Sequence, residues 1–185
     1  TCTMSRRHEL GLCLLSVNLL LSACSGGDAG SAALPATETD HYRYQSASRD
    51  GIGKIYEGRE ISQVMGHLGA GWLERPSRMR EERTDLLIRR LPLSEDSVVA
   101  DIGAGTGYFT FPVARRVPKG RVYAVDIQTE MLDIIAARQT DLGISNIVPV
   151  LGQIDDPGLD ANTVDLIFIV DAYHEFSHPR EMGDA

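Results

Sequence analysis

A glycine-rich string near the middle of the chain has the residue types of a ligand site. Asp101 is followed by Gly103, Gly105 and Gly107, which alternate with other residues in the string DIGAGTG. Glycine lets backbone amides approach a ligand where no Cβ obstructs them. A carboxylate beside such a loop attracts a positively charged group and repels a pyrophosphate. The string therefore predicts a site for a ligand that carries positive charge.

The spacing of these glycines differs from that of the dinucleotide-binding fingerprint, G-x-G-x-x-G. In that register the third glycine would occupy the position of Tyr108. The spacing therefore disfavours an NAD-linked oxidoreductase. A tight turn without a ligand is the plainer alternative for the glycines, and an acid at a helix N-terminus is the plainer alternative for Asp126. The ligand interpretation is favoured because Asp126 follows the complete string, 19 residues after Gly107.

Alternating elements must position these residues. Apolar runs predict strands over 97–102, 121–125, 146–150 and 164–170, and helical patterns lie over 107–117 and 129–141. This alternation with short loops predicts an α/β fold, a Rossmann-like parallel sheet flanked by helices. Asp101 and Asp126 then stand at the carboxyl ends of strands. Pro149 predicts that its strand lies at a sheet edge, because proline has no N–H for a central ladder.

Residues 98–107, VVADIGAGTG, resemble motif I of the class I S-adenosylmethionine-dependent methyltransferases. The resemblance implies S-adenosylmethionine as the cofactor and methyl transfer as the reaction. It also implies that Asp126 binds the ribose hydroxyls and that Ile127 lies against the adenine, supported by Met131. The ligand chemistry agrees, because S-adenosylmethionine carries an ammonium, a sulfonium and a ribose but no phosphate. The acceptor is not readable from the sequence.

Further candidates follow the third and fourth expected strands. Family members often carry an acid beside the adenine amine after the third strand. Here Gln153 stands at that place, with Asp155 and Asp156 close by, and the sequence does not decide among the three. Asp171, after the fourth strand, would face the cofactor and the substrate entrance. His174 is a candidate general base, although a surface histidine is the more ordinary interpretation.

The stretch before the sheet, residues 51–96, is expected to be a helical segment. Its apolar spacings predict helices over 61–68 and 78–91, and the partial Rossmann-like cofactor domain then covers residues 97–185. Three side chains of the helical segment are candidates for covering the cofactor or recognising substrate, with ordinary packing as the favoured alternative: His67, Trp72 and Arg75.

The N-terminus has the order of zones found in an export signal. A basic pair, Arg6 and Arg7, precedes a short apolar run, and the run ends in Leu-Ser-Ala-Cys at Cys24. Residues 4–23 thus resemble a bacterial lipoprotein signal peptide. That resemblance implies lipidation of Cys24 and a membrane anchor facing the periplasm or the cell exterior. A buried apolar helix is the alternative, and the chain would be cytoplasmic if the signal were unused.

Composition limits the possible partners. Residues 24–50 are poor in large aliphatic residues and are expected to form a flexible tether. The formal net charge is −8, which disfavours a nucleic-acid partner and leaves a small-molecule acceptor. The three cysteines all fall within the first 24 residues, so no disulfide framework or cysteine metal site is expected in the globular part. The sequence does not indicate an oligomeric state.

The alternatives to a methyltransferase come from other classes. A non-enzymatic, membrane-tethered binding module that retains the fold is one, and an NAD-linked oxidoreductase is the disfavoured other. An aminopropyl transferase would share the fold and suit an acidic site. The family sheet has seven strands whereas four are expected here, which suggests a C-terminally truncated chain. The fourth strand, near 164–170, would then be an exposed apolar edge.

Overall fold

A computed structural model describes residues 41–185. The expected signal peptide, the lipidation site Cys24 and most of the expected tether lie outside these residues. Within them, no helix combines the length and the apolar character needed to cross a membrane.

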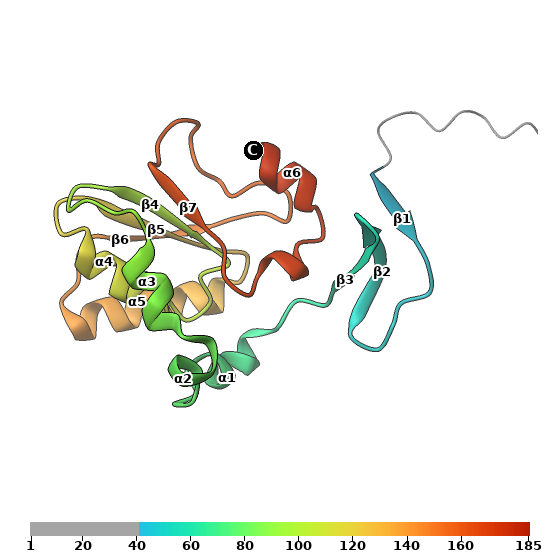
Figure 1. Cartoon of the computed structure of the whole chain (residues 1–185), viewed down its shortest axis with the longest axis horizontal. Helices are drawn as coiled ribbons and strands as arrows, with labels where there is room; N and C mark the ends of the chain where they lie inside the picture. Colours follow the sequence, from blue (N-terminus) through green and yellow to red (C-terminus); the bar gives the residue numbers. More distant parts are fainter. Residues whose placement is uncertain (1–40) are drawn as a thin grey trace, which may run out of the picture. The chain divides into compact units, whose positions relative to one another are not determined.

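A four-stranded parallel sheet forms the centre of the described part (Figure 1). Its order is β6-β5-β4-β7, and each neighbouring pair is parallel. The strands are β4 (Val98–Ile102), β5 (Arg121–Asp126), β6 (Ile147–Leu151) and β7 (Leu166–Phe168). The predicted α/β fold is therefore confirmed. Pro149 lies in β6 at one edge, as predicted, and β7 at the other edge is shorter than the expected strand over 164–170 and pairs with β4.

Two helices pack against this sheet and bury its core. They are α4 (Thr110–Arg116) and α5 (Thr129–Leu142). Phe111, Val113 and Ile135 from these helices are almost fully buried against Val99 and Val122 of the strands. Nearly every strand residue is apolar, and the two central strands, β4 and β5, are the most deeply buried.

The helix expected over 107–117 begins later, at Thr110. Gly103, Gly105 and Gly107 all have positive φ, so the backbone before Thr110 is incompatible with a right-handed helix. Pro112 is the third residue of the helix. It is tolerated there because the first N–H groups of a helix have no intrahelical partner.

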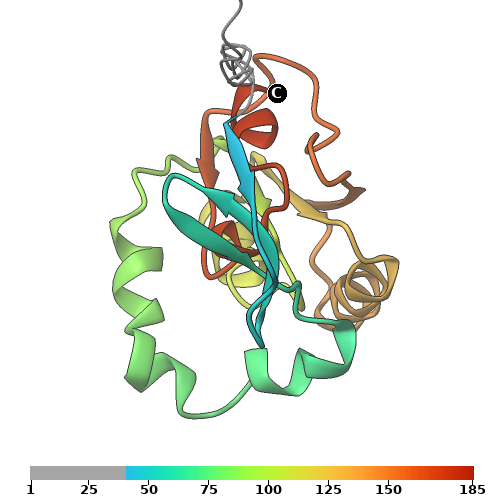
Figure 2. The same ribbon diagram turned by 90° about the vertical axis from the view of Figure 1, so that its right-hand side faces the viewer.

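The segment before the sheet differs most from its prediction. Residues 42–62 contain an antiparallel sheet of three strands, β1 (Tyr42–Tyr44), β2 (Gly51–Tyr56) and β3 (Arg59–Ser62), which Figure 2 shows in front. The expected helix over 61–68 is wrong, and the helical segment does not begin at residue 51. The cause is a tight hairpin at Glu57-Gly58, where φ is positive at both residues as a two-residue hairpin loop requires.

The expected tether over 24–50 is also incorrect at its end. Residues 42–44 form β1 and pair with β2, and Tyr42 is buried. The Tyr42 hydroxyl donates to the carboxylate of Glu181 in α6 (Pro179–Asp184). Burial, aided by this carboxylate, raises the pKa of Tyr42 to about 12. Lys54 of β2 donates a hydrogen bond to the carbonyl of Ser177 at 2.6 Å. The antiparallel sheet is therefore bonded to the C-terminal part of the chain.

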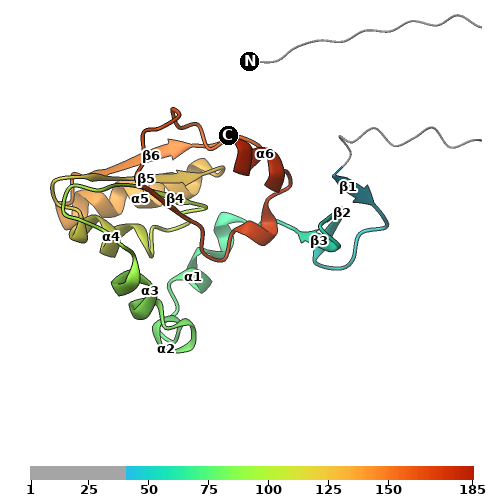
Figure 3. The same cartoon turned by 45° about the horizontal axis from the view of Figure 1, so that its top comes forward.

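Short helices follow the antiparallel sheet. They are η1 (His67–Gly69), α1 (Ala70–Leu73), α2 (Arg78–Glu82) and α3 (Thr84–Arg90), and η2 (Tyr173–Glu175) comes after β7. Helices α1, α2 and α3 lie on one side of the parallel sheet (Figures 1 and 3). The single helix expected over 78–91 is divided at Arg83, whose φ is +50. The division turns α3 so that the buried Thr84 lies 3.3 Å from the hydroxyl of Tyr108.

Candidate functional site

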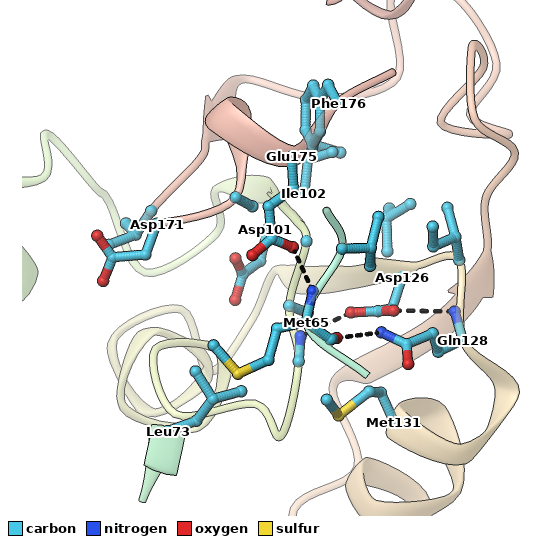
Figure 4. Close-up of a pocket in the computed structure, with 18 of the residues that line it drawn as sticks. Met65, Leu73, Asp101, Ile102, Asp126, Gln128, Met131, Asp171, Glu175 and Phe176 are labelled. Carbon is cyan, nitrogen blue, oxygen red and sulfur yellow. Dashed lines mark hydrogen bonds between the residues drawn. The ribbon is translucent and has the colours of Figure 1, made fainter. Parts of the chain in front are cut away.

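A pocket lies at the carboxyl ends of the parallel strands and is open to solvent at its mouth (Figure 4). Eight residues predicted from the sequence line it: Asp101, Gly103, Gly105, Asp126, Ile127, Met131, Gln153 and Asp171. Seven other candidates are not among its lining residues: Gly107, Asp155, Asp156, His174, His67, Trp72 and Arg75. The topology accounts for the first group, because loops after parallel strands meet at one edge.

The glycine loop has a shape that side chains would not allow. Gly103 has φ +76, and a Cβ there would overlap the Cβ of Ala172. Gly105 has φ +55, and its Cβ would stand 2.9 Å from a methyl of Leu73. The amides of Gly103 and Ala104 both donate to the carbonyl of Val125 at 2.9 Å. The loop is thus fixed against the end of β5 before any ligand binds.

Gly107 has a different role from the one predicted. It does not line the pocket, and its φ is +81. A Cβ at this position would come within 2.7 Å of the Phe111 ring and 3.2 Å of Ile135. The third glycine of the string therefore allows α4 and α5 to pack closely beneath the loop, and it makes no pocket contact.

Two carboxylates, those of Asp101 and Asp126, line the pocket near the carboxyl ends of β4 and β5. Asp126 is 7% exposed and accepts hydrogen bonds from the amides of Gly105 and Gln128, both at 2.9 Å. Burial raises the pKa of Asp126, although these two hydrogen bonds act in the opposite direction. Asp126 is therefore anchored by the backbone on each side of it, with its remaining lone pairs available to a ligand.

Asp101 is more deeply buried, at 3% exposure. Its carboxylate accepts a hydrogen bond from the Thr110 hydroxyl at 2.6 Å. Burial raises the pKa of Asp101 to about 7, and the nearby negative charge of Asp126 adds to the effect. A buried carboxylate that titrates near neutrality gains from any ligand cation placed beside it. The buried carboxylates of Asp101 and Asp126 therefore favour a ligand that places a positively charged group in the pocket.

The acid after β7 has a protein partner. Asp171 has φ +55, and its carboxylate accepts from the guanidinium of Arg78 at 3.1 Å. Arg78 itself is buried, donates to the carbonyl of Leu73 and also pairs with Glu82. The one cationic side chain among the pocket-lining residues is therefore already engaged within the described structure. Arg78 was not predicted from the sequence, because an arginine in an early helical turn is usually exposed.

His174 lies outside the pocket, and the neighbouring residue lines it instead. Glu175 accepts a hydrogen bond from the amide of Met65 at 3.1 Å, and burial raises the pKa of its carboxyl group. Gln128, directly after Ile127, also lines the pocket. Neither Glu175 nor Gln128 was predicted as a site residue. The sequence signal that could have found them is that each directly follows a predicted residue. Trp72 and Arg75 stack on each other 4.0 Å apart without lining the pocket.

Comparisons with known proteins agree with this geometry. Residues 99–183 match a family model described as a methyltransferase domain. An uncharacterised methyltransferase-like protein of Schizosaccharomyces pombe is 29% identical over 55% of this chain and 37% of its own length. A fibrillarin-like rRNA/tRNA 2'-O-methyltransferase of Methanocaldococcus jannaschii is 31% identical over 51% of this chain and 39% of its own. The chain thus spans less than two fifths of these relatives.

A solved structure shows the same fold. A SAM-dependent methyltransferase from Aquifex aeolicus superposes with a TM-score of 0.60 and 29% identity, covering 64% of this chain and 63% of the other. SAM there denotes S-adenosylmethionine, the cofactor expected from motif I. Residues 99–183 therefore match a methyltransferase domain, set in the Rossmann-like α/β fold of the class I methyltransferases.

Proposed function

We propose that this chain binds S-adenosylmethionine in the pocket and transfers its methyl group to a small-molecule acceptor. The observation that carries the proposal is the pair of buried carboxylates, Asp101 and Asp126, at the ends of neighbouring parallel strands beside a glycine loop. A dinucleotide phosphate would be repelled by this pair, whereas an ammonium and ribose hydroxyls satisfy it.

The lining residues fit the parts of the cofactor. The free lone pairs of Asp126 suit the ribose hydroxyls, and Asp101 suits the positive end of the ligand. Ile127 is 41% exposed and lines the pocket together with the buried Met131, so both suit an adenine ring. Of the three candidates for the adenine amine, Gln153 lines the pocket and Asp155 and Asp156 do not. This supports Gln153 for that contact.

The chemistry requires positioning more than an attacking side chain. S-adenosylmethionine supplies an electrophilic methyl group on a sulfonium. The chain's own contribution is a fixed glycine loop, two anchored carboxylates and apolar walls that exclude water. Met65, Leu73, Phe176 and Met182 provide those walls. His174, at 43% side-chain exposure and outside the pocket, is poorly placed as a general base.

The charge of the pocket favours a small acceptor over nucleic acid. Four carboxylates line it, and its one cationic side chain, Arg78, is paired with Asp171. A polyanion gains nothing from such a surface. Although one relative carries the name of an rRNA/tRNA methyltransferase, this pocket supports an uncharged or cationic small molecule.

The test is methyl transfer from S-adenosylmethionine labelled in its methyl group. The full chain is incubated with separate pools of small phenols, amines and thiols, and with total RNA. The proposal predicts label in a small-molecule product and loss of that label in Asp126→Ala. Label in RNA alone would overturn the acceptor class. Binding of S-adenosylhomocysteine without transfer to any pool would favour the non-enzymatic module, and binding of NAD instead would favour the oxidoreductase.

We also propose that lipidation of Cys24 anchors the chain to a bacterial membrane, with the pocket-bearing part outside the cytoplasm. Its support is the order of basic, apolar and small residues that ends at Cys24. The measurement is incorporation of an alkyne fatty acid in bacteria that express the full chain. Label and membrane association should both disappear in Cys24→Ser. Unlabelled protein that stays in the cytoplasm would contradict the anchor.

A further inference from the structure

Residues 64–74, called the covering segment below, supply a wall of the pocket that does not come from the parallel sheet. Val64, Met65 and Leu73 of this segment line the pocket. The segment joins β3 to α2 and carries η1 and α1. It approaches the glycine loop closely, because a methyl of Leu73 would stand 2.9 Å from a Cβ at Gly105.

Side chains from two loops of the parallel sheet hold the front of the covering segment. The Gln128 side chain donates to the carbonyl of Met65 at 3.0 Å and accepts from the amide of His67 at 2.9 Å. The Glu175 carboxylate accepts from the amide of Met65 at 3.1 Å. Figure 4 shows the contacts of Glu175 and Gln128 with the backbone of Met65. Each contact joins residues that are more than 60 positions apart in the chain.

A third loop holds the rear of the segment. Glu74 accepts from the Thr106 hydroxyl at 2.6 Å and from Arg138 at 2.9 Å. Loops after β4, β5 and β7 therefore all reach the covering segment. Gln128 and Glu175 line the pocket, as Thr106 does at the rear. The front contacts differ because they bond the backbone of the covering segment, whereas the rear contact joins two side chains. A ligand that fills the pocket therefore lies beside the side chains that hold the segment.

Resting on the proposed function, we propose that Gln128 and Glu175 are positioning residues that hold the covering segment over the bound cofactor and set its residence time. They do so through the backbone of Met65 and His67. Release of these three hydrogen bonds frees the front of the segment and opens the pocket to exchange. The rear contact at Glu74 keeps the segment attached while the front opens.

The chain contains a fluorescent reporter of ligand exchange in this segment. Trp72 is the single tryptophan, it lies in α1 within the covering segment, and it is 60% exposed. Stopped-flow fluorescence of Trp72 in the full chain follows the dissociation of S-adenosylhomocysteine when the complex is diluted. The variants are Gln128→Ala, Glu175→Ala and Glu175→Gln. The last keeps an oxygen that accepts from Met65.

The matched controls make the same chemical changes away from the pocket. Gln139 also bonds backbone carbonyls through its amide, those of Ile144 and Ile147, so Gln139→Ala controls for Gln128→Ala. Glu60 also accepts backbone amides, from Ser48 and Gly53, so Glu60→Ala controls for Glu175→Ala. Melting curves of every variant identify any that fail to fold. Should an Ala variant fail, hydrogen exchange of the Met65 and His67 amides in Glu175→Gln and the wild type gives a second readout.

We expect dissociation to be about threefold to tenfold faster in Gln128→Ala and Glu175→Ala, with association changed less. Glu175→Gln should restore most of the slow rate, and both controls should match the wild type. Unchanged dissociation in both Ala variants overturns the positioning role. A Glu175→Gln variant as fast as Glu175→Ala also overturns it, because charge rather than the hydrogen bond would then matter. Failure of the wild type to bind S-adenosylhomocysteine would instead refute the proposed function itself.

Discussion

The glycine loop and the covering segment line the same pocket but are held by different means. The loop, residues 103–107, is fixed by its own backbone conformation and by two amides bonded to Val125. The covering segment is fixed by side chains of Gln128 and Glu175, which lie 61 and 110 residues away from the groups that they bind. The glycine conformations of the loop can be predicted from residue types. The long-range side-chain contacts of the covering segment become visible only in the folded chain.

The largest effect should come from breaking the loop. In Gly103→Ala the new Cβ overlaps Ala172 and the backbone keeps a strained φ. We expect S-adenosylhomocysteine affinity to fall at least about 100-fold, measured by calorimetry. Gly58→Ala is the matched control, because Gly58 has φ +80 with open space around its Cβ position. Equal losses in the two variants would show that strain alone, and not the contact with Ala172, is responsible.

Removing the acid beside the loop should have the next largest effect. Asp126→Ala deletes a buried carboxylate that accepts two backbone amides and faces the pocket. Because hydrogen bonds to charged groups contribute about 1.5–3 kcal/mol, S-adenosylhomocysteine affinity should fall about 10- to 100-fold in a calorimetric titration. Asp165→Ala, which removes an exposed carboxylate bonded to the Val98 amide, should leave it unchanged. A loss in Asp165→Ala of the same size would mean that general stability was being measured.

The pH dependence of binding tests the other carboxylate. The pKa of Asp101 is raised to about 7 in the ligand-free protein, so a ligand ammonium must first displace its proton at lower pH. The dissociation constant of S-adenosylhomocysteine should therefore fall by up to about fivefold from pH 6 to pH 7, by up to about tenfold from pH 6 to pH 8, and level off above pH 8. Asp101→Asn should flatten this profile. A wild-type profile without slope would place the cation away from Asp101.

The same residue makes a stability prediction of opposite direction. The unfolded chain releases the Asp101 proton at its ordinary pKa near 3.8, whereas the folded chain holds it until about pH 7. The free energy of unfolding should therefore decrease as the pH rises from about 4 to about 7 in the ligand-free protein. Melting curves should show a smaller decrease in Tm over this range for Asp101→Asn. Parallel decreases in both proteins would contradict the assignment.

The smallest effect should arise in the covering segment. A Cβ at Gly69 would stand 2.8 Å from the Cγ and sulfur of Met65, which is flexible enough to move aside. Gly69→Ala should shift Met65 and weaken S-adenosylhomocysteine binding about twofold to threefold in the same titration. Gly71→Ala, with open space around the new Cβ, should bind as the wild type does. A loss in Gly69→Ala as large as that in Gly103→Ala would erase the contrast between the two regions.

The parts of the fold that could be predicted from the sequence are those determined by residues close together in the chain. Apolar strands, the glycine string and Pro149 indicated the parallel sheet and one of its edges, because burial and backbone conformation act residue by residue. The prediction for residues 51–62 is wrong, because the apolar spacing of Ile61 with later residues is typical of a helix. The turn at Glu57-Gly58 and the pairing with β1 determine strands there instead.

The residues of the candidate site also fall into those that could be predicted from the sequence and those that could not. Asp101, Gly103, Gly105 and Asp126 were predicted from the glycine string and its resemblance to motif I, and Asp171 from its place after the fourth strand. The structure brings all five to one pocket. Arg78, Gln128 and Glu175 were missed, because their contacts join distant parts of the chain. Gly107 was assigned to the ligand although it packs under α4 and α5, since the motif does not distinguish these two uses of a glycine.

Calorimetric titration of the full chain with S-adenosylhomocysteine and, separately, with NAD is the most direct test of the central claim. The paired carboxylates beside the glycine loop predict saturable binding of S-adenosylhomocysteine, one per chain, with no heat from NAD. A stable, folded chain that binds NAD as well as or better than S-adenosylhomocysteine, or that binds neither, would contradict the claim.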